Sequence, residues 1–210
     1  MLAIFKREFK SYFQNVIGWL FVAALLAVYG LYFYVYNLKN GYPYISYDLK
    51  GIGFIMMIAV PILTMRSLSD EKKTKTDQLM LTSPVSVGRI VAGKYFAMAA
   101  VYTIDIALFA LSPLVLSIYC KVALSEAYVA LFGYWLYGLS CIAVGLFISS
   151  ISESVIISAI LTFAALFLSY MMQSITGLIS SSGNLLTKVL NCFDLYTPFE
   201  NFVSGCFSVT

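Results

Sequence analysis

The sequence predicts an all-α integral membrane protein that forms one domain over residues 1–210. Hydrophobic residues make up 61% of the chain and charged residues only 11%, whereas soluble domains average about half and a quarter respectively. Five apolar segments are each long enough to cross a bilayer as a helix, which takes about 20 mostly apolar residues. Composition and segment length together exclude an ordinary soluble domain.

The chain begins with an amphipathic segment over residues 1–14. Its apolar residues recur at helical spacing and its basic residues lie between them: Leu2, Phe5, Phe9, Tyr12 and Phe13 against Lys6, Arg7 and Lys10. Such a helix lies in the membrane interface. No clear cleavage site follows, so we expect the segment to be retained rather than removed as a signal peptide.

The five apolar segments are expected to span the membrane in order: residues 16–36, 51–68, 95–119, 128–150 and 155–178. The polar residues 37–50 form a loop, and Pro61 predicts a kink in the second span. Gly133, Gly138 and Gly145 give the fourth span a small-residue face suited to close packing. Residues 179–210 are polar and then amphipathic, and too broken to span.

The basic residues predict the orientation, because retained Lys and Arg mark the cytoplasmic side. They precede the first span and fill the connector between the second and third: Lys6, Arg7, Lys10, Arg66, Lys72, Lys73, Lys75, Arg89 and Lys94. Only Lys39, Lys50, Lys121 and Lys188 fall on the other side. We therefore expect a multi-pass protein of the cell membrane with a cytoplasmic N-terminus and an extracytoplasmic segment over 179–210.

The cytoplasmic connector, residues 69–92, reads as a helix, an elbow and a second helix. Pro84 restrains Ser83 from helical geometry, and Ser83 or Ser86 can cap the helix that leads into the third span. A solvated loop that only fixes orientation is the simpler interpretation. A rigid elbow continuous with a span instead favours a mechanical coupler.

The connector contains an acidic-basic run, a polar step, a Pro elbow and a closing Gly-Lys: Glu71-Lys72-Lys73, Thr76-Asp77-Gln78, Leu79-Met80-Leu81-Thr82-Ser83-Pro84-Val85-Ser86 and Gly93-Lys94. This order resembles the signature of ABC type-2 transporter permeases, closest to those of gliding motility and multidrug export. The likeness extends to the amphipathic start and to Phe199-Glu200-Asn201-Phe202. Lys75 and Gln78 depart from the usual Gly and Glu.

The resemblance implies a six-span permease subunit of an exporter that works as a homo- or heterodimer in the lipid bilayer. Each copy would dock a cytoplasmic ABC ATPase through a coupling helix, and a re-entrant helical segment would follow the fifth span. The coupling residues would be Glu71, Thr76, Asp77, Gln78, Leu79, Leu81, Thr82, Ser83 and Pro84. The expected sixth span is absent from this chain. Cys192 and Cys206 would lie outside, where a disulfide can form, but the sequence does not give their connectivity.

The composition argues against catalysis by this chain itself. It contains no histidine, the commonest metal ligand and neutral-pH acid–base group, and no Walker-type phosphate loop. We expect no catalytic residue, no metal, no directly bound cofactor and no nucleic acid. ATP and Mg²⁺ would be used by a partner ATPase in a separate chain or domain.

Asp105 is the most unusual residue of the spans. It lies about 10 residues after Tyr95, roughly 15 Å into the bilayer at 1.5 Å per residue. An ionisable group at that depth marks a substrate pathway or a paired interior site. The pathway would include Tyr102, Tyr134 and Tyr137, and either these hydroxyls, those of Thr103 and Ser140, or a second subunit would pair with Asp105. A neutral Asp105 that only holds two helices together is the alternative.

Other classes of function remain. A motor-independent channel or secondary transporter would show paired intramembrane charges or a repeat, and a membrane enzyme would show clustered reactive residues at one depth. The sequence shows neither pattern. A scaffold or sensor that binds an ATPase without transport stays open.

Overall fold

The computed structural model describes residues 2–74, 86–120, 122–179 and 194–203. Every regular element in these ranges is a helix. Five of the described helical stretches are long and apolar enough to cross a membrane: Val16–Lys39, Ser46–Lys73, Val87–Tyr119, Leu124–Ile151 and Val155–Met172. The predicted all-α fold with five candidate spans is therefore confirmed.

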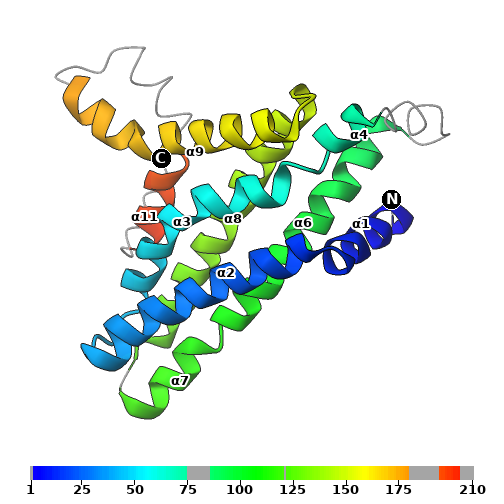
Figure 1. Cartoon of the computed structure of the whole chain (residues 1–210). Helices are drawn as coiled ribbons and strands as arrows, with labels where there is room; N and C mark the ends of the chain where they lie inside the picture. Colours follow the sequence, from blue (N-terminus) through cyan, green and yellow to red (C-terminus); the bar gives the residue numbers. More distant parts are fainter. Residues whose placement is uncertain (1, 75–85, 121, 180–193, 204–210) are drawn as a thin grey trace.

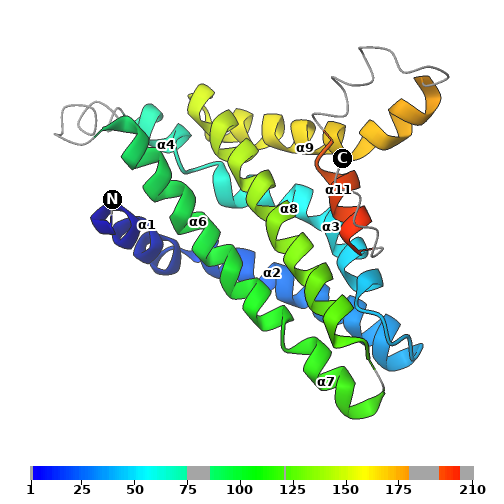
Figure 2. The same cartoon turned by 180° about the vertical axis from the view of Figure 1, so that it is seen from behind.

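The helices follow one another along the chain as α1 (Leu2–Gln14), α2 (Val16–Phe33), the π-helix η1 (Tyr34–Lys39), α3 (Ser46–Thr64), α4 (Ser69–Lys73), α6 (Val87–Phe109), α7 (Ser112–Tyr119), α8 (Leu124–Ile151), α9 (Val155–Ile179) and α11 (Tyr196–Val203). In Figures 1 and 2, α1, α4 and the start of α6 lie at one end of the bundle. We call this the α1 end. The opposite end, which holds η1 and α7, is the α7 end.

Helix α1 packs against α6 and α2, and the extended backbone of Asn15 separates it from α2. A side chain at Gly93 of α6 would crowd this contact, because a Cβ there would lie 3.0 Å from Cγ2 of Ile4. The burial of Ile4, Phe5 and Phe9 is intermediate, while Lys6 and Lys10 are exposed. The helical spacing seen in the sequence therefore separates a packed face from a basic one.

The first and second spans extend into the segment expected to be a loop at 37–50. Helix continues through η1 to Lys39 and resumes at Ser46. Asn37 and Asp48 are both buried, and the Asn37 side-chain amide donates a hydrogen bond to the Asp48 carboxylate. The sequence placed these two polar residues in a loop, but they form a buried, hydrogen-bonded pair between η1 and α3.

The third span is in two parts, since α6 ends at Phe109 and α7 begins at Ser112. Pro113 occupies the first turn of α7, where a missing N–H does no harm. The Ser112 hydroxyl donates to the Phe109 carbonyl across the break at 2.8 Å and also bonds the Tyr29 hydroxyl. These bonds satisfy polar groups that the interrupted helix frees.

The core is centred on α3 and α8. Gly138 of α8 faces Tyr102 of α6, whose ring carbon Cζ would lie 2.3 Å from an added Cβ. Gly145 faces Thr64 of α3 in the same way, with Oγ1 at 2.5 Å from an added Cβ. The small-residue face predicted for this helix is confirmed at these positions. At the C-terminal side of the described chain, α11 packs against α3, α8 and α9.

Candidate functional site

At the α1 end, a buried lysine lies where three helices, α1, α4 and α6, meet the turn after α3. Lys94 is two turns into α6, and only 2% of its surface is exposed. An ammonium group is costly to bury unless it is paired and hydrogen-bonded. The groups that pair with the Lys94 ammonium are therefore the central polar contacts at this end of the molecule.

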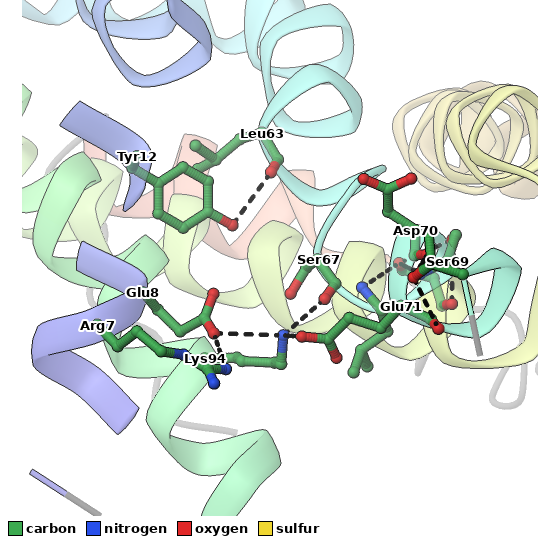
Figure 3. Close-up of polar contacts among 12 residues, drawn as sticks. Arg7, Glu8, Tyr12, Leu63, Ser67, Ser69, Asp70, Glu71 and Lys94 are labelled. Atoms are coloured by element: carbon green, nitrogen blue, oxygen red, sulfur yellow. Dashed lines mark hydrogen bonds and ion pairs between the residues drawn. The ribbon is translucent and has the colours of Figure 1, made fainter. Parts of the chain in front are cut away.

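Three oxygen atoms surround the Lys94 ammonium (Figure 3). Its Nζ donates to Oε1 of Glu71 in α4 at 2.6 Å and to the carbonyl oxygen of Ser67 at 2.8 Å. Oε1 of Glu8 in α1 lies 3.7 Å away. We call Glu8, Tyr12, Ser67, Glu71 and Lys94 the Lys94 junction. It joins α1, α4, α6 and the turn after α3 through one cation.

The charges of the junction are closely matched. Glu8 also pairs with the exposed guanidinium of Arg7 at 2.7 Å, so two cations face two carboxylates. Glu8 and Glu71 keep 16% and 19% of their side-chain surface exposed. Removing Lys94 alone would leave two neighbouring carboxylates with no shared cation. Removing one partner of a buried ion pair lowers the free energy of unfolding more than replacing the whole pair by apolar residues.

Tyr12 attaches α1 to the end of α3. Its hydroxyl donates to the Leu63 carbonyl at 3.5 Å. Burial, and then the nearby Glu8 carboxylate, raise the pKa of the Tyr12 phenol well above its usual value, against a smaller lowering by Ser67. The phenol therefore stays protonated at neutral pH and keeps its donor.

Helix α4 is in turn fixed to the end of α8. The backbone N–H groups of Leu68 and Ser69 both donate to the Ser149 hydroxyl at 3.2 Å. The Ser69 hydroxyl donates to the Ser149 carbonyl at 3.2 Å, and the Lys72 ammonium donates to the Ser150 carbonyl. These bonds hold α4 on the end of α8, and Glu71 of α4 is thereby held against Lys94.

A polar cavity of about 380 Å³ opens beside the junction. Arg7, Arg66, Asp70 and Lys94 contribute to its walls, so both signs of charge face it. Within the described residues, no three His, Cys, Asp or Glu side chains lie together as a metal site would need. The arrangement is that of an electrostatic joint between helices.

One of the nine coupling residues predicted from the sequence is in the described structure. Glu71 lies in the junction, whereas Thr76, Asp77, Gln78, Leu79, Leu81, Thr82, Ser83 and Pro84 lie outside the described residues. The Glu71–Lys94 contact nevertheless brings the first and last parts of the sequence pattern together. Sequence reasoning missed Glu8, although Glu8 is the single acidic residue of the amphipathic start.

The four residues predicted for a pathway lie in the packed bundle. Asp105 is fully buried, and neither of its carboxylate oxygens has a hydrogen-bond partner among the described residues. The Tyr102 hydroxyl donates instead to the Tyr134 carbonyl at 2.7 Å. The ring centroids of Tyr134 and Tyr137 lie 6.5 Å apart, and both side chains are buried. We call Asp105 and these three tyrosines the Asp105 cluster.

The hydroxyls expected to pair with Asp105 have other partners or none. Thr103 donates to the Ala99 carbonyl at 2.7 Å, and Ser140 to the Leu136 carbonyl at 3.1 Å. The Tyr134 hydroxyl is buried without a partner among the residues described. The expected pairing of Asp105 with Tyr102, Thr103, Tyr134, Tyr137 or Ser140 is therefore wrong, since neither carboxylate oxygen has a partner among the described residues. For Tyr102, Thr103 and Ser140, helix carbonyls one turn away or across the interface accept the hydroxyl instead.

Comparison with models of known protein families finds a family that matches the chain. A model of the ABC-2 family transporter proteins matches residues 27–207, which is most of the chain and includes the whole connector. No curated protein and no solved structure matches it. The matched range contains Ser67, Glu71 and Lys94 of the junction and the entire Asp105 cluster.

Proposed function

Because the chain belongs to the ABC-2 family of transporter proteins, we propose that it is the permease subunit of an ATP-driven exporter in the cytoplasmic membrane. A separate ATPase chain or domain binds ATP and Mg²⁺ and docks on the connector. A second permease copy completes the transporter. The excess of Lys and Arg at the α1 end supports a cytoplasmic position for this end.

The Lys94 junction is the observation that carries the coupling proposal. Glu71 lies on α4, before residues 75–85 of the connector, and Lys94 lies on α6, after them; their ion pair joins the two flanks at 2.6 Å. Since Glu8 and Tyr12 tie α1 to the same point, a displacement of the connector moves α4, α6 and α1 together. A bonded joint between rigid helices is what a mechanical coupler requires.

The Asp105 cluster supplies the second part of the proposal. Asp105 lies on α6, 11 residues beyond Lys94, so a shift of α6 at the junction also moves the carboxylate. In the present conformation the cluster is closed, with Tyr102 packed against Gly138 of α8. Transport would require α6 and α8 to separate here and expose Asp105 to the substrate.

Coupling is tested in lipid nanodiscs with the ATPase that co-purifies with the tagged chain from native membranes. ATP hydrolysis is compared for the ATPase alone, with the permease and with Leu79→Asp. We expect the permease to change the hydrolysis rate and Leu79→Asp to abolish that change while still inserting. Lys39→Met is the control, because Lys39 is exposed on η1 at the α7 end, away from the connector.

The outcomes separate the alternatives. If binding and altered hydrolysis survive in Leu79→Asp, coupling does not run through the connector. If the ATPase binds and responds but no export follows in vesicles, the chain is a scaffold or sensor. If no ATPase binds, a motor-independent channel or secondary transporter becomes the better account.

A further inference from the structure

A groove of about 530 Å³ runs along the outside of the bundle between α6 and α8. Most of its lining comes from small and large residues of α6, Ala100, Thr103 and Ala107 among them, and the rest comes from Trp135 and Leu139 of α8 and Phe5 of α1. Phe5 lies at the α1 end, where α1 crosses α6 near Gly93. The groove therefore begins beside the amphipathic helix and runs toward the middle of the span.

The polar atoms within the groove are satisfied by one another. The Trp135 indole N–H donates to the Thr103 hydroxyl at 3.1 Å, and that hydroxyl donates to the Ala99 carbonyl at 2.7 Å. The Tyr95 hydroxyl donates to the Leu139 carbonyl at 3.2 Å, and the remaining side chains of the lining are aliphatic or aromatic. An occupant consequently needs no hydrogen-bonding group along this stretch, and a flexible hydrocarbon chain fits it.

The length of the groove also matches a lipid. Its α6 residues run from Tyr95 to Ala107, which at 1.5 Å per residue is about 18 Å. One leaflet is about half of the 30 Å hydrocarbon thickness. A single acyl chain that entered beside α1 would fill the groove to its end.

Phe5 of α1 lines the start of the groove, which we call its mouth, and two lysines follow Phe5 on the same helix. Lys6 and Lys10 are exposed on one face of α1, one helical turn apart. Neither makes an ion pair with any residue that the structure describes. Juxtamembrane lysines attract anionic lipid headgroups. Charge at the mouth and hydrocarbon within the groove are complementary to the two parts of one acidic phospholipid.

We infer that the groove between α6 and α8 is a binding site for a resident acidic phospholipid, with one acyl chain against Trp135 and the phosphate at Lys6 and Lys10. The lipid belongs to the leaflet on the side of the α1 end. It fills the space under Phe5, where α1 crosses α6. The inference does not depend on the proposed transport function.

The fluorescence of Trp135, which lines the groove, can report whether a lipid is bound there. The chain has two tryptophans, so Trp19→Phe leaves Trp135 as the single one. In nanodiscs of zwitterionic phosphatidylcholine, we expect phosphatidylglycerol with brominated acyl chains to quench Trp135 fluorescence in a saturable way. Brominated phosphatidylcholine should need at least about a fivefold higher mole fraction for equal quenching, as expected for roughly one lysine–headgroup attraction.

Two variants with matched controls separate the chain site from the headgroup site. Ala100→Phe fills the groove and should remove the saturable quenching, whereas Ala24→Phe on the exposed face of α2 should keep it. Lys6→Gln with Lys10→Gln should remove the preference for the acidic lipid, whereas Arg89→Gln, exposed at the start of α6, should keep it.

Equal quenching by both headgroups, rising in proportion to mole fraction, would overturn the proposal, since it describes unselective boundary lipid. Unchanged saturable quenching in Ala100→Phe would overturn the placement in the groove. If Ala100→Phe does not fold, competition by unbrominated phosphatidylglycerol decides instead. Stronger recovery with unbrominated phosphatidylglycerol than with the same amount of unbrominated phosphatidylcholine supports a specific site, and equal recovery with both contradicts it.

Discussion

The Lys94 junction and the Asp105 cluster hold the buried lysine and the buried aspartate of α6, and they are built in opposite ways. Lys94 has three oxygen atoms within 3.7 Å, drawn from α1, α4 and the turn before α4. Asp105 has no hydrogen-bond partner among the described residues, although it is fully buried. A buried charge with hydrogen-bond partners can hold helices together. A buried carboxylate without partners destabilises the fold, and such groups in membrane spans usually have a function.

Breaking the joint should have the largest effect on stability. We expect Lys94→Met to lower the free energy of unfolding by about 2–3 kcal/mol, less than for a fully buried pair because Glu8 and Glu71 keep some solvent contact. Thermal unfolding in detergent measures the change. Lys73→Met should leave Tm nearly unchanged. Equal losses in both variants would mean that positive charge at this end, and not the junction, sets stability.

The Asp105 cluster is held by packing, and this can be tested at a glycine. Gly138→Ala places a methyl group 2.3 Å from the Tyr102 ring and should cost about 2 kcal/mol through overpacking. Gly30→Ala is the control, because nothing lies within 4 Å of a Cβ there, and Ala favours a helix over Gly. A tolerated Gly138→Ala would show that Tyr102 moves readily.

The anchoring of α4 on α8 should contribute less. Ser149→Ala removes the acceptor of the Leu68 and Ser69 N–H groups and should cost about 1–2 kcal/mol. Ser140→Ala, whose hydroxyl bonds only within its own helix turn, should cost markedly less in the same unfolding measurement. Similar costs would indicate that α4 is positioned by some contact other than Ser149.

Removing the unsatisfied carboxylate should cost least. Asp105→Leu loses no hydrogen bond to a described residue, so we expect no loss of Tm or a gain. Asp48→Leu is the counterpart, because it leaves the buried Asn37 amide without its acceptor and should lower stability by about 1–3 kcal/mol. Asp105→Asn should fold normally and alter transport. Full transport in that variant would remove Asp105 from the pathway.

The contrast also shows what the sequence could and could not predict. Hydropathy and segment length predicted five spans, and the Pro elbow predicted a helix running into the third span, which begins at Val87 as α6. These are local properties of a segment. The partners of Lys94 are not local, because Glu8 reaches it only when α1 folds back on α6.

The same limit explains the Asn37–Asp48 pair and the surroundings of Asp105. Polar composition indicated a loop at 37–50, but two polar side chains that share a hydrogen bond can remain inside a bundle, even with Oδ1 of each left without a partner among the described residues. Depth in the bilayer identified Asp105 correctly as unusual. That Asp105 meets no hydroxyl among the described residues depends partly on competition from helix carbonyls, which no spacing pattern reveals.

The most direct test of the account is a double-variant comparison at Glu71 and Lys94 in the reconstituted permease–ATPase complex. The change in ATP hydrolysis that the permease causes would be measured for Glu71→Gln, Lys94→Met and the two combined. The account predicts that each single variant loses most of this change and that the combination loses little more, because the residues act as one joint. Undiminished coupling in Lys94→Met, in protein that remains folded, would contradict it.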